Sequence, residues 1–186
     1  MTQKTPPFKI RLAIQQVNQG EVIAYPTEAV YGLGCNPVDE EAVLKLLALK
    51  KRSIDKGLIL IASSLEQLDC YLELTAEIVS RVQASGTDPV TWVIPAQSWV
   101  PKWLTGNHSS LAIRITNHPI ARLLCEENKG PLVSTSANTN ARPPAKKSWQ
   151  VSKNLESKNL FIVAGEVGSL KQATPIFDVL SQHKFR

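Results

Sequence analysis

Apolar residues recur at helical spacing in several separate stretches of the chain. The first predicted helix covers residues 10–17, and its apolar face comprises Ile10, Ala13, Ile14 and Val17. Gly20 follows at the position expected of a C-terminal cap. A second helix is predicted to begin at the acidic residues 39–41 and to end near the basic residues 50–52, an arrangement that suits the helix dipole.

Helices and strands alternate along the rest of the chain. Ser64 and Gln67 have the spacing of a capping box, which predicts a helix there, and two more helices are expected after Thr75 and over 119–127. Short apolar runs typical of strands occupy residues 21–25, 57–62, 90–94, 111–115, 131–133, 160–164 and 176–180. The irregular segment 95–110 is a candidate lid or rim of a site.

This alternation predicts an α/β protein built on an open, twisted and mixed sheet. The 186 residues suffice for one buried core, and no tract resembles a linker. We therefore expect a single domain over residues 1–186, with residues 1–7 as a flexible N-terminus.

The composition indicates a globular protein, with 43% hydrophobic and 20% charged residues. The longest apolar stretches have the length of strands, and the first residues lack the apolar core of a secretory signal. We therefore expect a cytoplasmic protein with no membrane segment. The three cysteines and three histidines show neither disulfide nor metal-ligand spacing, so no protein-bound metal is expected.

The net charge of +5 is unevenly distributed along the chain. From Lys129 onward there are 9 basic and 3 acidic residues, whereas the first 128 residues hold 12 and 13. A basic excess of this kind favours a polyanionic partner, either nucleotide phosphate or nucleic acid. Charge alone does not distinguish the two.

Two polar clusters follow predicted strands, where ligands usually bind in α/β sheets. Residues 134–138 (STSAN) bring three hydroxyls and a carboxamide together after an apolar run. Residues 25–34 (YPTEAVYGLG) offer the hydroxyl of Thr27 and two glycines that permit close backbone approach. Each cluster is also compatible with a structural turn, because short polar side chains often satisfy their own backbone.

Positive charge is concentrated in Lys50, Lys51, Arg52 and Lys56. These residues are suited either to a phosphate site or, in part, to capping the preceding helix. Arg114 lies inside an apolar strand and shares a face with Ala112, so it is either a carboxylate clamp or a solvated residue. The chain has neither a phosphate-binding P-loop nor a Gly-x-Ser-x-Gly nucleophile, which favours positioning of anionic reactants over covalent catalysis.

Taken together, these clusters resemble those of the YrdC-type threonylcarbamoyl-AMP synthases. The motifs occur in the order and spacing of that family over residues 8–186, and they are YPTEAVYGLG (25–34), KKRSIDKGL (50–58), PVT (89–91), LAIRI (111–115) with HP (118–119), and STSAN (134–138). The resemblance implies an α/β domain around a basic concave cavity. It also implies a reaction in which L-threonine, bicarbonate and ATP give threonylcarbamoyl-AMP and pyrophosphate for tRNA modification.

The resemblance also assigns roles to individual residues. Lys50 and Arg52 are the expected catalytic residues. ATP is expected to bind as its Mg²⁺ complex to Lys50, Arg52, Lys56, Ser134, Asn138 and Arg186. Threonine is expected to bind Thr27, Arg114, Ser136 and Thr174, with Arg114 on its carboxylate. Downstream tRNA-modification proteins are the implied partners.

Two short stretches depart from the pattern of the family. Residues 87–91 read TDPVT where the family has PGPVT, so that Asp88 replaces a flexible glycine. Residues 139–141 read TNA where a hydrophobic residue, serine and glycine are usual. Neither departure removes an expected phosphate or carboxylate ligand.

Two alternatives remain from the sequence. A protein that binds tRNA or double-stranded RNA would use the basic C-terminal third, although the chain has no RRM or KH signature. A related carbon–oxygen enzyme, dihydroxybutanone-phosphate synthase, would need an acidic metal cluster that is absent from the sequence.

Overall fold

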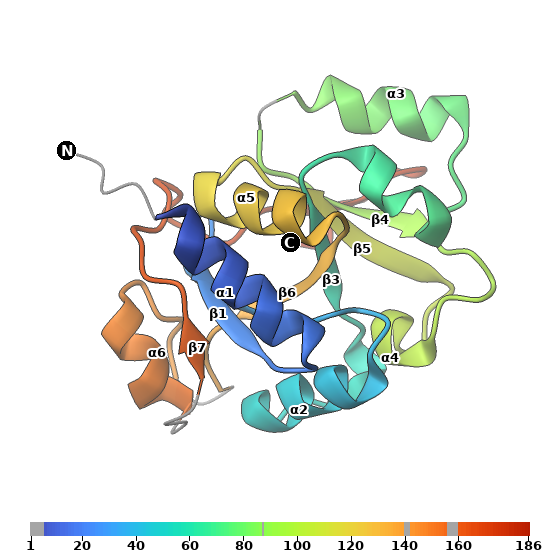
Figure 1. Ribbon diagram of the computed structural model, residues 1–186. Helices are drawn as coiled ribbons and strands as arrows, with labels where there is room; N and C mark the ends of the chain where they lie inside the picture. Colours follow the sequence, from blue (N-terminus) through green and yellow to red (C-terminus); the bar gives the residue numbers. More distant parts are fainter. Residues whose placement is uncertain (1–5, 87, 140–141, 156–159) are drawn as a thin grey trace.

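The computed structural model describes residues 6–86, 88–139, 142–155 and 160–186, which form one eight-stranded mixed sheet and its covering helices (Figure 1). The strand order is β7-β1-β2-β6-β3-β5-β4-β8. The strands are β1 (Ile23–Pro26), β2 (Tyr31–Gly34), β3 (Ile59–Ala62), β4 (Thr91–Pro95), β5 (Ser110–Ile115), β6 (Leu132–Ser136), β7 (Phe161–Ile162) and β8 (Ile176–Asp178). Strand β3 runs parallel to β5 and antiparallel to β6, so the predicted open, mixed α/β sheet is confirmed.

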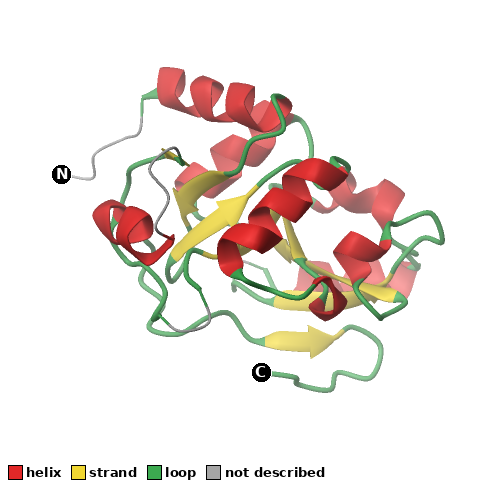
Figure 2. Cartoon of the chain, turned by 90° about the horizontal axis from the view of Figure 1, so that it is seen from below, coloured by secondary structure: helices red, strands yellow, loops and turns green. Residues whose placement is uncertain are grey.

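Helices pack on both faces of this sheet (Figure 2). The helical elements are α1 (Pro7–Asn18), α2 (Glu40–Lys50), η1 (Ile54–Lys56), η2 (Leu65–Tyr71), α3 (Ala76–Ala84), α4 (Lys102–Thr105), α5 (Pro119–Asn128) and α6 (Ser148–Leu155). Helices α1 and α5 lie side by side and bury Ile61 and Leu132 (Figure 1). The neighbouring residues Leu60 and Val133 point to the opposite face and belong to the larger core, which includes α2 and α3.

A row of short or apolar side chains crosses four strands on the face that also carries α1 and α5. Ser134 pairs with Ile59, Ile59 with Ala112, and Ala112 with Val93. Paired residues point to the same side of a sheet, so these side chains form a continuous surface. All four line a cavity, and this row is its floor.

The structure differs from the predicted elements at β2. Residues 25–34 were expected to form a strand end and a tight turn, but β2 pairs with β1 as a hairpin. Gly34 makes this pairing possible, because a Cβ there would lie 2.6 Å from the carbonyl oxygen of Val133 and 2.8 Å from Cε1 of Tyr25. The two glycines therefore permit close packing inside the sheet and do not mark the end of a strand.

Other local expectations were also wrong. The segment from Ser64 is the 3₁₀ helix η2, and Ser64 makes no side-chain cap; instead the side-chain oxygen of Gln67 accepts a hydrogen bond from Ser63 N at 2.9 Å. Helices α4 and α6 were not predicted, and β7 and β8 are shorter than expected. The residues of the departures at 87 and 140–141, like residues 1–5 of the expected N-terminal tail, lie outside the described residues.

Candidate active site

A cavity of about 720 Å³ lies on the floor formed by β6, β3, β5 and β4. It brings together residues from both ends of the chain and from the middle. The predicted site residues that line it are Thr27, Arg52, Lys56, Arg114, Ser134, Ser136, Thr174 and Arg186. Lys50 and Asn138 are not among its lining residues.

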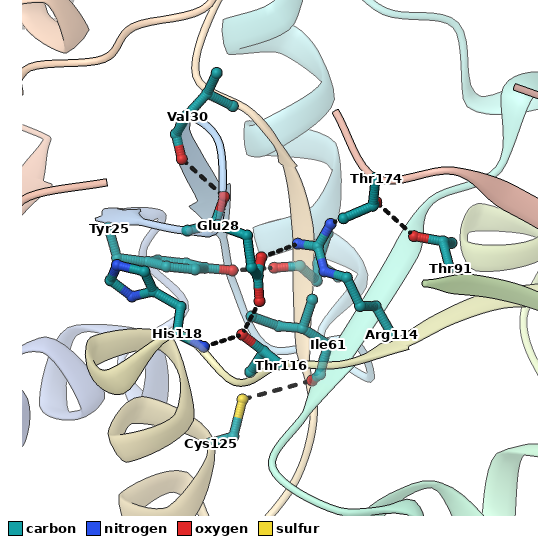
Figure 3. A network of polar contacts seen from close by, with 12 residues as sticks. Tyr25, Glu28, Val30, Ile61, Thr91, Arg114, Thr116, His118, Cys125 and Thr174 are labelled. Atoms are coloured by element: carbon teal, nitrogen blue, oxygen red, sulfur yellow. Dashed lines mark hydrogen bonds and ion pairs between the residues drawn. The ribbon is translucent and has the colours of Figure 1, made fainter. Parts of the chain in front are cut away.

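Arg114 marks one end of the cavity, which we call the Arg114 end together with Glu28 and Thr174. Strand β5 places Arg114 beside Ala112, and its side chain is 10% exposed. Its Nη1 donates to Oγ1 of Thr174 at 3.1 Å, and its Nη2 lies 3.5 Å from Oε2 of Glu28 (Figure 3). Arg114 is therefore buried in the cavity wall, which excludes a merely solvated arginine.

Glu28 lies in the β1–β2 turn and is buried against Arg114. Thr116 donates a hydrogen bond to its Oε1 at 2.5 Å, and the backbone N–H of His118 donates to Oγ1 of Thr116 at 3.3 Å (Figure 3). Burial alone would raise the pKa of Glu28, but the charge of Arg114 and the bond from Thr116 hold that pKa below its usual value. Glu28 is therefore ionised at neutral pH.

Thr174 is held from several sides at the same end. Its hydroxyl pairs with that of Thr91 at 2.9 Å, in addition to accepting from Arg114. Its carbonyl oxygen accepts from Nε and Nη2 of Arg186 at 3.3 and 3.1 Å. Arg186, which also lines the cavity, thus helps to position Thr174.

Thr27 is fixed by the turn that follows β1. Both its backbone N–H and its hydroxyl donate to the carbonyl oxygen of Val30, at 3.0 and 2.8 Å. The hydroxyl proton is used internally, so the oxygen keeps its lone pairs as acceptors for a donor in the cavity. The turn supplies four consecutive lining residues, which are Thr27, Glu28, Ala29 and Val30.

The other end, which we call the basic end, is formed by the segment after α2. Arg52 is half-buried, and its Nη2 donates to the carbonyl oxygen of Gly57 at 2.9 Å. Burial lowers the pKa of Arg52 from its usual value. Lys56 also lines the cavity but is exposed, while Lys51 is the left-handed C-cap of α2. The helix cap therefore explains Lys51 alone among the four cations.

Lys50 lies behind the cavity wall. It is 3% exposed, and its ammonium donates to the carbonyl oxygens of Ser136 and, at 2.8 Å, of Asn138. Burial, with a smaller contribution from the charge of Arg52, lowers the pKa of Lys50 to about 8. Lys50 therefore fixes the backbone after β6, and its predicted contact with ATP stays a prediction.

Some polar residues of β6 and of the turn that follows it line the cavity, whereas others hydrogen-bond to the backbone. Ser134 and Ser136 line the cavity, and so does Thr135 between them. Asn138 instead donates through Nδ2 to the carbonyl oxygens of Thr139 and Arg142, at 2.9 and 2.7 Å. Its Oδ1 is buried and, within the described residues, has no hydrogen-bond partner.

Some lining residues were missed by the sequence analysis, notably Glu28, Lys146 and Lys171. Glu28 lies inside the YPTEAVYGLG motif but received no role, because nothing local indicated its burial beside Arg114. The two lysines belong to the basic C-terminal third, so the charge asymmetry was their signal. With Arg52, Lys56 and Arg186 they make the cavity predominantly basic.

In the described part of the chain, no cluster of three or more His, Cys, Asp or Glu residues is arranged to hold a metal ion. None of the helices found there combines the length and apolar character needed to cross a bilayer.

The sequence profile of the family described as telomere recombination (Sua5, YciO and YrdC) matches residues 15–186. A threonylcarbamoyl-AMP synthase of Halorhodospira halophila is 47% identical over 175 residues, covering 94% of this chain and 92% of that protein. A protein of the same name from Methylococcus capsulatus is 43% identical over 180 residues, covering 96% and 97% of the two chains.

Solved structures share the fold. Sua5 of P. abyssi in complex with L-threonine superposes with a TM-score of 0.87 at 30% identity, over 95% of this chain. This chain spans only 52% of the length of that Sua5 protein. YciO of E. coli, at 23% identity and a TM-score of 0.81 over 95% of this chain, shows the fold alone.

Proposed function

Because the chain belongs to the Sua5, YciO and YrdC family, we propose that it is a threonylcarbamoyl-AMP synthase. The observation that carries this proposal is a single cavity that is lined both by the buried Arg114 and by further cations, among them Arg52, Lys56 and Arg186. An amino acid and a triphosphate require these two kinds of site within reach of each other.

In this reaction the amine of L-threonine and bicarbonate form a carbamate, with loss of water. A carbamate oxygen then attacks the α-phosphate of ATP, so that a new P–O bond forms and pyrophosphate leaves. The nucleophile is the substrate carbamate, so the reaction requires none from the protein. The contribution of the protein is to position the reactants and to stabilise negative charge.

The Arg114 end would bind threonine. Arg114 offers a planar, doubly donating group to the carboxylate, and the hydroxyl oxygens of Thr27, Ser136 and Thr174 lie in the same cavity. Identity with the curated synthases extends over most of this chain, and the P. abyssi relative was solved with L-threonine.

The basic end would bind ATP as its Mg²⁺ complex. Arg52 and Lys56 are placed for the phosphates, and Ser134 and Arg186 also line the cavity. Among the described residues that line the cavity, the basic end offers hydroxyls and cations but no carboxylate, so Mg²⁺ would be held by the triphosphate rather than by the protein. Lys50 and Asn138 would act on ATP by shaping the turn after β6.

The test is pyrophosphate release from ATP with Mg²⁺, bicarbonate and L-threonine. We expect release that requires all four components, that stops when EDTA removes Mg²⁺, and that is accompanied by threonylcarbamoyl-AMP in the mass spectrum. Pyrophosphate release at the same rate without threonine, or none with all components present, would contradict the proposal.

Partners and location are part of the same proposal. The labile product would pass in the cytoplasm to proteins that modify tRNA. Direct tRNA binding would use the basic C-terminal third, where Lys146 and Lys171 reach the cavity. Its signature is an affinity for tRNA that falls steeply as salt increases.

A further inference from the structure

Glu28 is the only acidic residue among the described residues that line the cavity. Its side chain is 9% exposed, so its charge is largely removed from solvent. Burying a carboxylate costs free energy unless the group is paired. The presence of one in the wall of an otherwise basic cavity therefore requires an explanation.

The two carboxylate oxygens of Glu28 are in different situations. Oε1 accepts a short hydrogen bond from Thr116, at 2.5 Å. Oε2 is buried, lies 3.5 Å from Nη2 of Arg114, and has no hydrogen-bond partner within the described residues (Figure 3). Charge-assisted hydrogen bonds between a guanidinium and a carboxylate are about 2.7–2.9 Å long. Oε2 therefore keeps its acceptor capacity for another donor.

A zwitterionic amino acid fits this arrangement. Its carboxylate and its α-amino group are carried by the same carbon, so they fit neighbouring opposite charges on the protein. We propose that Oε2 of Glu28 accepts a hydrogen bond from the α-amino group of threonine while Arg114 binds its carboxylate. This inference rests on the proposed function and adds an amine-recognition residue to it.

The ionisation of Glu28 agrees with this role. An ionised carboxylate can only accept hydrogen bonds, so it is matched to the N–H groups of the substrate and not to its carboxylate. The low pKa of Glu28 also keeps it from storing the amine proton, which makes it a binding group rather than a general base. The carbamate nitrogen retains one N–H, so this contact can persist after carboxylation.

A different role for Glu28 would be to hold Arg114 in place and nothing more. The two roles are separable with 3-hydroxybutyrate, which has the carboxylate, hydroxyl and methyl groups of threonine but no amine. Loss of a residue that only positions Arg114 weakens the binding of both compounds alike. Loss of an amine acceptor weakens the binding of threonine alone.

The first experiment uses the unaltered protein. Calorimetric titration with L-threonine and with 3-hydroxybutyrate, each in the presence of Mg²⁺ and a non-hydrolysable ATP analogue, compares the two dissociation constants. We expect threonine to bind roughly 10- to 100-fold more tightly, the range of a hydrogen bond to a charged group. Equal affinities would overturn the inference, without any variant that must fold.

The second experiment compares Glu28→Gln with Glu166→Gln. The control removes an equal charge from the exposed side chain of Glu166. The contact of Glu166 with His118 is made by its backbone carbonyl, which the substitution keeps. We expect Glu28→Gln to raise the KM for threonine roughly 10-fold or more, to leave the KM for ATP within about twofold, and to abolish the preference over 3-hydroxybutyrate. The control should match the unaltered protein in all three.

Two outcomes of the second experiment are decisive. Unchanged threonine KM and unchanged preference in a folded Glu28→Gln protein would overturn the inference. If that variant unfolds, Glu28→Asp replaces it, because aspartate keeps the charge but its side chain is one methylene shorter. The inference then requires that Glu28→Asp lose the preference for threonine over 3-hydroxybutyrate. If the unaltered protein itself shows no threonine-dependent pyrophosphate release, the proposed function fails, which is distinguishable from failure of the role of Glu28.

Discussion

The two ends of the cavity hold their charged groups in different ways. At the Arg114 end, Arg114 is held by other side chains, because its guanidinium contacts the hydroxyl of Thr174 and the carboxylate of Glu28, although Arg186 donates there to the backbone carbonyl of Thr174. At the basic end, cations bind the backbone: Arg52 donates to the carbonyl of Gly57, and Lys50 to that of Asn138.

This difference separates two ways in which a site is organised. A network of side chains fixes the position of each charge before a ligand arrives, so a substitution there should act directly on ligand binding. Cations that bind carbonyl groups fix the course of the chain, so a substitution there should alter both the stability of the protein and the shape of the phosphate site. The predictions test this division.

The largest effect is expected from Arg114→Ala. Removing a buried carboxylate clamp should weaken threonine binding by about 2–5 kcal/mol, and it also leaves Glu28 without its charged neighbour. The KM values for threonine and ATP, measured separately, should show the loss mainly for threonine. Arg122→Ala, on the exposed face of α5, is the matched control. An unchanged affinity for threonine would remove Arg114 from the site.

A smaller effect on stability is expected from Lys50→Met. The variant leaves the carbonyls of Ser136 and Asn138 without the ammonium, which should lower the free energy of unfolding by about 1–3 kcal/mol and raise the KM for ATP. Denaturant unfolding and steady-state kinetics measure the two effects. Lys51→Met removes an exposed lysine next in the chain and should change neither. A raised KM for threonine alone would contradict the division between the two ends.

The smallest effect is the pH dependence that Lys50 imparts. Burial and Arg52 lower the pKa of Lys50 to about 8, so its charge, and with it kcat/KM for ATP, should decline above about pH 8 at saturating threonine. Because this pKa lies below the unfolded value of 10.5, the folded protein binds fewer protons between these values, and stability from this group rises with pH there. In Lys50→Arg, which stays charged, the decline in activity should move to higher pH. A decline that stays in place would assign it to another group.

Most of the fold could be predicted from the spacing of apolar residues along the sequence. The elements that could not be predicted have physical causes. Helix α1 and strand β5 were predicted because apolar side chains repeat at their own period. Strand β2 was not, since Gly32 and Gly34 are typical of turns, and the requirement for glycine comes from Tyr25 and Val133 packed against it. Contacts of that kind have no local signature.

The site was accessible in part. The residue types indicated anionic reactants, and the alternation of β5 placed Arg114 with Ala112. Lys50 follows Leu46 by four residues and so shares its buried helix face, a signal for burial that the sequence does contain. The pairing of Glu28 with Arg114 joins residues far apart in the chain, and only the assembled sheet brings them together.

Strand β8 has a consequence for how a ligand enters and leaves. It is only three residues long, it is the outermost strand on its side of the sheet, and Thr174 lies just before it. Such margins open locally at a much lower free energy than central strands. A brief detachment of β8 and of Thr174 before it would remove one hydrogen-bond partner of Arg114, while β3, β5 and β6 stayed paired. Such a detachment would open the cavity at the edge of the sheet while the central strands stayed paired.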